Sequence, residues 1–393
     1  MESNDIRQNA WRRKLQLDRT AAGGTLESSL ESDAHFIALD DRIRLAKERM
    51  RRIVIEQFGA DQALLDTVDK IEVSSQEAAS VLAQDERAPT DDEYASLEAI
   101  VAFDGSRPSF ILKEDRIDFD SSWCTSQWRT TLSPFQESLA DFSACVGRVE
   151  IGESGIGSVF LISPTLAITN RHVAQLIAQF DGQKMTVKDH VNVDFGREYK
   201  GRSSYDRRQV RSIVFAGTAS IVQPVDHGKL DLAVLELSKS TLSEDLSQRF
   251  LKIGTHADPV TDGMVLATVG FPGDWRRFAP LVLQSQYETV IARLLEGDSG
   301  SKRLAPGEFT GMLDNPPGWT LTHDATTING NSGSPLTIMK GAGALDAIGL
   351  HYGGTWQGAR ANWAHLLADC LSAETIPDQR SLREALMARD VVV

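Results

Sequence analysis

The spacing of hydrophobic and polar residues changes character once along the chain, near residue 146. Over 36–58, apolar residues recur every three or four positions, with charged residues between them. This series consists of Leu39, Ile43, Ala46, Met50 and Ile53. Such spacing places the apolar side chains on one face of a helix. The pattern therefore predicts a helix over 36–58, a second over about 64–71 and a third over 76–84.

A capping signal opens a fourth predicted helix. Thr90 and Glu93 lie three residues apart, so the hydroxyl of one and the carboxylate of the other can accept each other's free backbone N–H groups. We expect this helix to run to about Val101. Short amphipathic helices need one another to bury their apolar faces, so the pattern predicts a small helical bundle over 1–103.

Beyond this bundle the pattern becomes that of a β protein. Short apolar runs alternate with glycines and prolines, which is typical of an all-β barrel or sandwich. The runs cover 146–151, 159–162, 166–169, 210–215, 232–237, 264–270 and 347–351. A second capping pair, Ser381 and Glu384, opens a terminal helix to about residue 389.

The change of pattern divides the chain into three predicted parts. Residues 1–103 form a helical module with a regulatory or adaptor role. Residues 104–143 form a bridge with two short strands, over 109–113 and 116–120, and a helix over 134–145. The last part, 144–393, is the β domain with its terminal helix.

Composition excludes several classes of protein. Of 393 residues, 55 are acidic and 41 basic, for a net charge of −14, which opposes general binding to nucleic acid. The sequence offers neither the ~18 consecutive apolar residues of a membrane span nor a secretory signal, so no membrane partner is expected. The three cysteines, Cys124, Cys145 and Cys370, form no C-x-x-C pair, which predicts reduced thiols, a cytoplasmic protein and no metal site.

The strongest chemical signal is the sequence GNSGSP over 330–335. Glycines on both sides of Ser332 would let a tight turn expose its hydroxyl. The backbone N–H groups of Gly330 and Ser332 could then form an oxyanion hole, which stabilises the charge on a tetrahedral intermediate. Because a free serine hydroxyl is a poor nucleophile, a base and an orienting carboxylate are also required.

Both partners occur in the sequence. His172 follows the apolar run 166–169, and Asp231 directly precedes the run 232–237. The order along the chain is histidine, aspartate, serine. Each motif is weak alone, but the three together in a β-rich chain predict a His172–Asp231–Ser332 triad.

With these motifs, the sequence resembles the trypsin-like (chymotrypsin-fold) serine proteases, and within them the bacterial glutamyl endopeptidase-like branch. The resemblance covers roughly 144–370. It implies two six-stranded β-barrels with the site between them, and a protease without cofactors. The expected fold is thus a mainly β, chymotrypsin-like double barrel preceded by a small α-helical domain. By the same resemblance His172 is general base and then acid, Asp231 orients it, and Ser332 is the nucleophile.

A second element, GLHYGG over 349–354, is similar to a Gly-Ile-His-Trp-Gly-Gly element of the glutamyl endopeptidases. The resemblance implies that Leu350, His351, Tyr352 and Gly353 lie beside the bound peptide, which would add to the sheet as a strand. It also implies that His351 and Thr327 recognise an acidic P1 side chain. The alternative is that His351 is a buried structural histidine beneath the S1 pocket.

Four features depart from the family pattern or stand outside it. Asn331 precedes the serine where trypsin zymogens carry an aspartate that pairs with a new N-terminus, so activation of that kind is not expected. Val173 stands where many secreted relatives have a half-cystine. His323 and Asp324 are interpreted as loop scaffolding. Surface loop positions are predicted for His190, His227 and His256.

These observations predict an intracellular serine endopeptidase of narrow specificity that acts on a protein or peptide and is gated or recruited through a protein partner of its helical module. Bacterial trypsin-like domains fused to small helical modules resemble components of anti-phage defence operons, where some cleave gasdermin-like partners. Two alternatives remain open. One is a cytoplasmic quality-control protease, and the other is a non-catalytic interaction protein on a protease fold.

Overall fold

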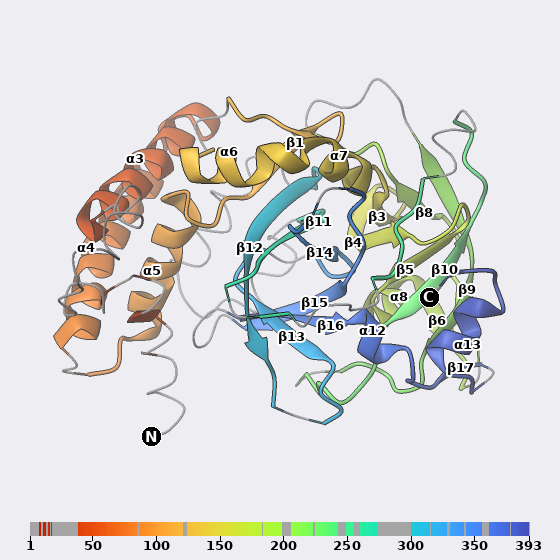
Figure 1. The fold of residues 1–393 in the computed structure, drawn as a ribbon. Helices are drawn as coiled ribbons and strands as arrows, with labels where there is room; N and C mark the ends of the chain where they lie inside the picture. The colour runs from red at the N-terminus through yellow and green to blue at the C-terminus, as the bar shows by residue number, and fades with distance from the viewer. Residues whose placement is uncertain are drawn as a thin grey trace.

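The computed structural model describes most of the chain. The described residues are 8, 11, 12, 15, 17 and 38–392, except for 85–86, 121–123, 183, 199–205, 223–224, 243–248, 255–259, 262, 273–299, 315, 328–330, 342, 356–360 and 378. Figure 1 shows the two parts of the molecule, a group of helices and a larger body of curved sheets.

The helical part contains α3 (Leu39–Gln57), α4 (Gln62–Gln84) and α5 (Asp91–Phe103), which pack on one another. The separate second and third helices predicted from the sequence are wrong, because α4 runs through both without a break. Ser75 lies in its middle, and its hydroxyl donates to the carbonyl of Glu72 at 2.7 Å. A serine that bonds back to its own helix in this way need not end the helix.

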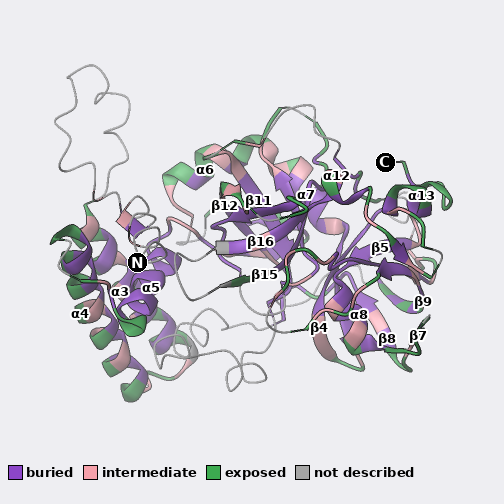
Figure 2. Ribbon diagram, turned by 90° about the horizontal axis from the view of Figure 1, so that it is seen from below, coloured by how far each residue is buried: buried purple, intermediate pink, exposed green. Residues whose placement is uncertain are grey.

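The predicted cap of α5 is confirmed. The Thr90 hydroxyl accepts from the N–H of Glu93, and the Glu93 carboxylate accepts from the N–H of Thr90 at 2.6 Å. Helices α3 and α4 each bury one face and expose the other, whereas α5 is buried over most of its length (Figure 2). The module therefore has a hydrophobic core of its own.

The bridge packs onto the sheets rather than hanging between the two parts. It contains β1 (Phe110–Lys113), β2 (Arg116–Ile117), α6 (Ser126–Leu132) and α7 (Gln136–Ala144), with a 3₁₀ turn before α7. Strand β1 pairs antiparallel with a strand of the second barrel. Helix α6, which was not predicted, begins at a Thr125 cap whose hydroxyl accepts from the N–H of Trp128.

The first barrel is a closed ring of six antiparallel strands. In order around the ring these are β3 (Val146–Ile151), β4 (Ser154–Leu161), β5 (Leu166–Thr169), β10 (Ala233–Leu237), β9 (Arg207–Gly217) and β8 (Val191–Asp194). Pairing of β3 with β8 closes the ring. Helix α8 (Arg171–Ile177) follows β5, and a hairpin of β6 (Ala178–Phe180) and β7 (Met185–Val187) follows the helix.

The second barrel is also a closed ring of six. It consists of β11 (Val265–Gly270), β12 (Arg303–Met312), β13 (Thr320–His323), β16 (Ala361–Leu366), β15 (Gly349–Thr355) and β14 (Pro335–Ile338). The chain then passes through α12 (Leu367–Cys370) and β17 (Thr375–Ile376), which pairs with β9 of the first barrel, to α13 (Leu382–Met387). The predicted double barrel and terminal helix are confirmed.

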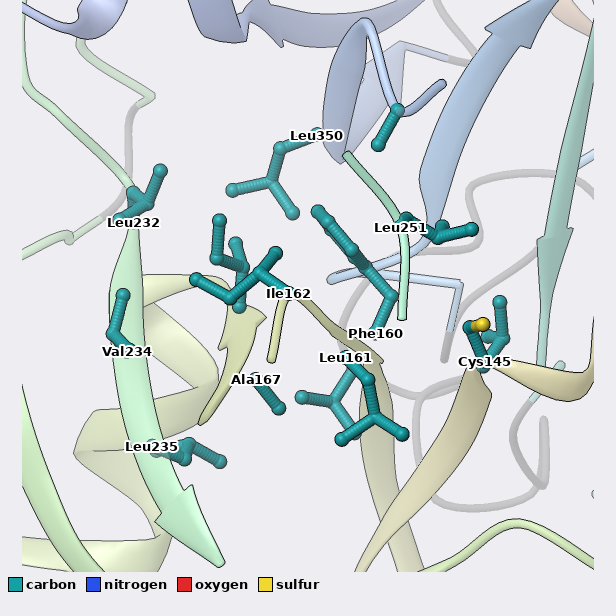
Figure 3. Packing of buried hydrophobic residues seen from close by; sticks show 14 of the residues in the cluster. Cys145, Phe160, Leu161, Ile162, Ala167, Leu232, Val234, Leu235, Leu251 and Leu350 are labelled. Atoms are coloured by element: carbon teal, nitrogen blue, oxygen red, sulfur yellow. The ribbon is translucent and has the colours of Figure 1, made fainter. Parts of the chain in front are cut away.

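Apolar packing joins the two barrels. One large cluster fills the first barrel and reaches the bridge and the terminal segment. In Figure 3, Phe160, Ile162 and Leu232 of the first barrel lie near Leu350 of β15. The catalytic candidates therefore lie on two barrels that share part of one hydrophobic cluster. Of the helices in the described part of the chain, none combines the length and hydropathy that a membrane crossing needs.

A buried lysine ties the bridge to the second barrel. Lys302, just before β12, is completely buried, and its ammonium lies 2.8 Å from a carboxylate oxygen of Asp115 in the bridge. The same ammonium donates to the carbonyl of Ser143 at 2.9 Å. A buried charge needs such partners, so these bridge residues are part of the interior of the β domain.

Candidate active site

His172 and Asp231 form a two-point contact at one end of the first barrel. His172 is the second residue of α8, and its N–H donates to Asp231 Oδ1 at 2.9 Å. Its ring Nδ1 lies 2.6 Å from Asp231 Oδ2. An ionised carboxylate can only accept, so Nδ1 carries a proton and Nε2 is left as the basic nitrogen.

Asp231 is itself held from both barrels. Its carbonyl accepts from the side-chain amide of Asn170 at 2.9 Å, and its N–H donates to Nε2 of His365 on β16 at 2.9 Å. The residue is 3% exposed. These contacts fix the backbone of Asp231, from which the carboxylate reaches His172, and one of them comes from the opposite barrel.

A cluster of aromatic and histidine side chains lies behind Asp231. The Tyr352 ring stacks on His365 with centroids 4.4 Å apart, and its hydroxyl lies 2.6 Å from Nδ1 of His227. Burial lowers the pKa of His365 to about 4. A neutral ring is what its Nε2 needs to accept from Asp231. The surface position predicted for His227 is wrong, since it is half-buried and supports Tyr352. His190 is exposed as predicted, and His256 lies outside the described residues.

Ser332 lies in a turn clamped between the barrels. Its carbonyl accepts from the N–H of Ser158 on β4 at 2.7 Å. Gly333 has φ +92°, and a Cβ added there would lie 1.9 Å from the Ser158 carbonyl oxygen. Only glycine fits this turn. A Cβ at Gly157 would contact both Val173 and the Ser332 carbonyl, so the residue after His172 and the serine turn converge there.

The oxyanion-hole prediction is only partly covered by the structure. Ser332 is half-buried in the described turn, whereas Gly330 lies outside the described residues. Asn331, in the position of the zymogen aspartate, is buried, and its carbonyl accepts from the N–H of Ser334 at 2.9 Å. The turn is thus closed by its own backbone.

Two of the residues expected beside the peptide, Leu350 and His351, are engaged by neighbouring segments of the chain. Leu350 pairs with Pro335 on one side and His365 on the other, and its side chain is completely buried. The N–H of His351 donates to the Ser334 carbonyl, and its carbonyl accepts from Gly333, each at 2.9 Å. The part of this strand that remains for pairing with a peptide is 352–354, where Gly353 is half-buried and Gly354 is exposed.

The two residues expected to read P1 are buried on neighbouring elements. His351 is 4% exposed, and its Nδ1 lies 3.3 Å from Nε2 of His323 at the end of β13. The interpretation of His323 as loop scaffolding is therefore wrong, because it is a fully buried strand residue against His351. Its polar neighbours along β13, Thr320 and Thr322, hid this strand from a search for apolar runs.

Asn362 on β16 fastens the segment between these residues. Its amide nitrogen donates to the carbonyls of Ala325 at 2.7 Å and His323 at 3.3 Å. Its Oδ1 accepts from the Thr327 hydroxyl at 2.6 Å. Two carbonyl acceptors define which end of the amide is nitrogen. In this arrangement the Thr327 proton is engaged by Asn362, so a P1 carboxylate would have to compete for it.

The cysteines and acidic residues add no metal chemistry to the part of the chain that the structure describes. There, no three side chains of histidine, cysteine, aspartate or glutamate gather as a metal ion would need. Burial raises the pKa of the Cys145 thiol to about 12, and Cys370 is also buried. Both thiols stay protonated and behave as core residues.

Comparison with known proteins identifies the family. Residues 157–342 match the family model described as trypsin-like peptidase domain. A probable serine protease of Lysobacter enzymogenes is 30% identical over 286 residues, which cover 67% of this chain and 70% of the relative.

Two solved structures are also similar. Neuropsin, a serine protease of mouse brain, aligns with TM-score 0.39 and 15% identity over 58% of this chain and 91% of its own. A mutant of human heparin binding protein (CAP37) aligns with TM-score 0.38 and 14% identity over 57% and 87%. The double barrel, the match to the peptidase domain and the bacterial relative together show that this chain belongs to the trypsin-like serine proteases.

Proposed function

We propose that this chain is a serine endopeptidase in which His172, Asp231 and Ser332 act as the catalytic triad. The observation that carries the proposal is the two-point contact between His172 and Asp231, with 2.6 Å between Nδ1 and Oδ2. This contact selects the tautomer whose Nε2 can accept a proton. The tight turn at Ser332, held by β4, supplies a serine of the kind that the proposal needs.

In the proposed first step, Ser332 Oγ attacks the scissile carbonyl carbon while its proton passes to Nε2 of His172. The electron pair of the C=O bond moves to the oxygen, and backbone N–H groups of the 330–332 turn stabilise that charge. Asp231 stabilises the imidazolium without taking its proton. The intermediate then collapses to an ester on Ser332, and the proton on Nε2 leaves with the amine.

The second step reverses these roles with water. His172 Nε2 takes a proton from water, whose oxygen attacks the ester carbonyl carbon. Collapse of this intermediate breaks the bond to Ser332 Oγ and releases the acid. Ser332 Oγ recovers its proton from His172. Both steps depend on an imidazole that stays hydrogen-bonded to Asp231 and keeps its proton on Nδ1.

The proposal is tested by intact-mass analysis after treatment with a fluorophosphonate. We expect one adduct on the wild-type protein and none on Ser332→Ala. His172→Ala should retain the fold and label far more slowly, because the hydroxyl then has no base. A folded wild-type protein without an adduct, or an adduct that persists on Ser332→Ala, contradicts the proposed triad.

We also propose a preference for glutamate or aspartate at P1. The support is the contact between His323 and His351, two buried imidazoles on adjoining strands. If His323 Nε2–H donates to His351 Nδ1, the proton of His351 is on Nε2, where it can donate to a carboxylate. The Thr327 hydroxyl would join by turning from Asn362.

A P1 panel of otherwise identical peptides tests this preference. We expect kcat/KM to be highest for glutamate, and His351→Leu to remove at least tenfold of the ratio between glutamate and alanine. The exposed His190 provides the matched control, since His190→Asn removes an imidazole that touches none of these residues and should leave the ratio unchanged. A wild-type enzyme that prefers another P1 residue refutes the proposed specificity.

For the helical module we propose a recruiting or gating role with a protein partner, in the cytoplasm and in bacterial anti-phage defence, with a gasdermin-like or other effector as substrate. The support is architectural, since α3–α5 have a core separate from that of the barrels. Reversing the exposed charges of Asp41, Arg44 and Glu48 on α3 should abolish activation by a partner and leave peptide cleavage intact. Parallel loss of both activities contradicts a separable adaptor.

A further inference from the structure

The segment that joins the helical module to the β domain runs beside the proposed P1-reading residues. Between α5 and β1, Arg107 lies against two acidic residues of the second barrel. Its Nε lies 2.7 Å from Asp324 Oδ1, and its Nη2 lies 3.1 Å from Glu308 Oε1. The side chains of Arg107 and Asp324 are 14% and 10% exposed, so water screens this pair only weakly.

Backbone contacts bind the same two segments together. The Thr326 hydroxyl donates to the Arg107 carbonyl at 2.5 Å. Asp324 also accepts at Oδ1 from the N–H of Glu308 at 2.8 Å. Asp324 and Thr326 therefore both hold Arg107, and they lie between His323 and Thr327, the residues proposed to shape the P1 site.

The other end of the joining segment is held by helices. Arg42 of α3 lies 2.7 Å from the Asp104 carboxylate, and Arg49 of α3 donates to the Phe103 carbonyl at 3.0 Å. The indole N–H of Trp128 on α6 donates to the Gly105 carbonyl at 3.1 Å. Figure 1 shows α6 between the helical group and the sheets. Arg107 is thus joined through two or three residues to anchors on α3 and α6.

We propose that Arg107 is a positioning residue for the S1 specificity pocket, through which the helical module holds segment 323–327 in place. The proposal rests on the proposed function and specifies how that site is regulated. In trypsin zymogens a new N-terminus pairs with an aspartate that Asn331 replaces here. In this chain the cation comes from the joining segment, and its acceptor, Asp324, lies between His323 and Thr327 of the proposed P1 site.

The geometry separates this role from catalysis. Without the guanidinium, the Asp324 and Glu308 carboxylates lose the cation between them and repel, which loosens 323–327. Asp231 is held by Asn170 and His365. The Ser332 turn is held by backbone hydrogen bonds to Ser158 and His351 rather than by Arg107. Loss of Arg107 should therefore weaken recognition of P1 more than it slows the attack by the serine.

The test uses the full chain with Arg107→Ala, Arg107→Lys and, as the matched control, Arg116→Ala. Arg116 lies on the same bridge and pairs only with Glu137 at the surface among the contacts that the structure describes. We expect Arg107→Ala to lower the selectivity for the preferred P1 residue over alanine at least tenfold, mainly through KM. The rate and stoichiometry of fluorophosphonate labelling should change less than threefold. Arg107→Lys should recover part of the selectivity, and Arg116→Ala should match wild type.

Hydrogen exchange keeps the test independent of activity. Amides of 323–327 should exchange faster in Arg107→Ala than in Arg116→Ala, whether or not the protein cleaves any peptide. Unchanged exchange and selectivity, or labelling that falls in parallel with cleavage, overturns the proposal. A wild-type protein without an adduct refutes the triad instead, and the exchange result still decides the role of Arg107.

Discussion

The two barrels have the same number of strands and different interiors. The first is filled by apolar side chains such as Phe160, Ile168 and Val234, all completely buried. The second has a smaller apolar cluster, and polar side chains are buried beside it. These include Thr320, Thr322, His323, Asn362 and His365. The first barrel also buries polar side chains, but several of them form ion pairs, such as Arg148 with Glu150 and Arg208 with Asp206. The contrast is therefore between a large apolar core with ion pairs in the first barrel and a smaller core with hydrogen-bonded neutral side chains in the second.

The division matches the proposed roles. His172 and Asp231, the proposed proton-transfer pair, belong to the first barrel with its large apolar core. Ser332 and the proposed P1 residues belong to the polar barrel, whose buried donors and acceptors can discriminate between substrates. Variants of each barrel should therefore affect different quantities.

The largest effect is expected in the apolar barrel, on activity rather than stability. Asp231→Asn should lower kcat by about 10⁴-fold, because an amide can donate to Nδ1 and so select the wrong tautomer of His172. Peptide cleavage at saturating substrate measures it, and Asp189→Asn, an exposed change in the same barrel, is the control. A loss below about tenfold would mean that Asp231 does not orient the base.

Core substitutions compare the interiors directly. Phe160→Ala should lower the free energy of unfolding by about 3–5 kcal/mol, through lost apolar burial and the cavity left behind. Thr322→Val removes a hydroxyl that bonds Thr310 at 2.8 Å and the Gly311 carbonyl at 3.0 Å. It should cost less, about 1–3 kcal/mol. Urea titration measures both, and an equal or larger cost for Thr322→Val would contradict the contrast between the barrels.

Acid should destabilise the protein through a histidine buried in the second barrel. Burial lowers the pKa of His365 from its usual 6.5 to about 4, so between these values the unfolded chain binds the proton and the folded chain does not. The free energy of unfolding should then have its full value above pH 6.5, where His365 is neutral in both states. It should fall by about 3 kcal/mol as the pH drops to 4.

His365→Gln isolates this contribution. Glutamine offers Asp231 N–H an acceptor that does not titrate, so the free energy of unfolding should vary less between pH 6.5 and 4. His190→Asn, which removes an exposed histidine, should leave the wild-type slope. Denaturant titrations at several pH values give the three slopes, and identical slopes for wild type and His365→Gln would refute the assignment to His365.

The smallest effects are expected on the outer faces. Arg211 on β9 and Met312 on β12 are exposed strand residues, one from each barrel. Replacing either with threonine should change the free energy of unfolding by no more than about 0.5 kcal/mol. Thermal melts of the two variants measure this, and a large loss in only one barrel would place part of the contrast outside the interiors.

The same contrast explains how much of the fold could be predicted from the sequence. Strands of the first barrel such as β5 and β10 consist mostly of apolar residues, interrupted only by Thr169 and Glu236, so the sequence alone predicts them. In the second barrel, β13 and β16 bury threonine, asparagine and histidine. The residues along these strands therefore form no run of apolar positions from which a strand could be predicted. Their pairing is non-local, so only the folded chain shows why those polar residues are inside.

The residues of the candidate site also differ in how far the sequence predicts them. His172, Asp231 and Ser332 stand in short motifs with a local signature, and in the structure Nδ1 of His172 lies 2.6 Å from Asp231 Oδ2. His227, His323 and His365 have no such signature. Each contributes through a partner more than 25 positions away, such as Tyr352, His351 or Asp231, and distances of that kind cannot be read from spacing.

The buried Lys302 has a consequence for where this protease begins. Its ammonium is neutralised by Asp115, which precedes the first barrel strand by about thirty residues. A chain cut immediately before β3 would keep every strand of both barrels, but Lys302 would lose its 2.8 Å ion pair with Asp115 and keep only Glu198, at 4.0 Å, as a described carboxylate partner. The bridge carboxylate therefore belongs to the interior of the protease domain, and a fragment that begins at β3 should be less stable than one that includes the bridge.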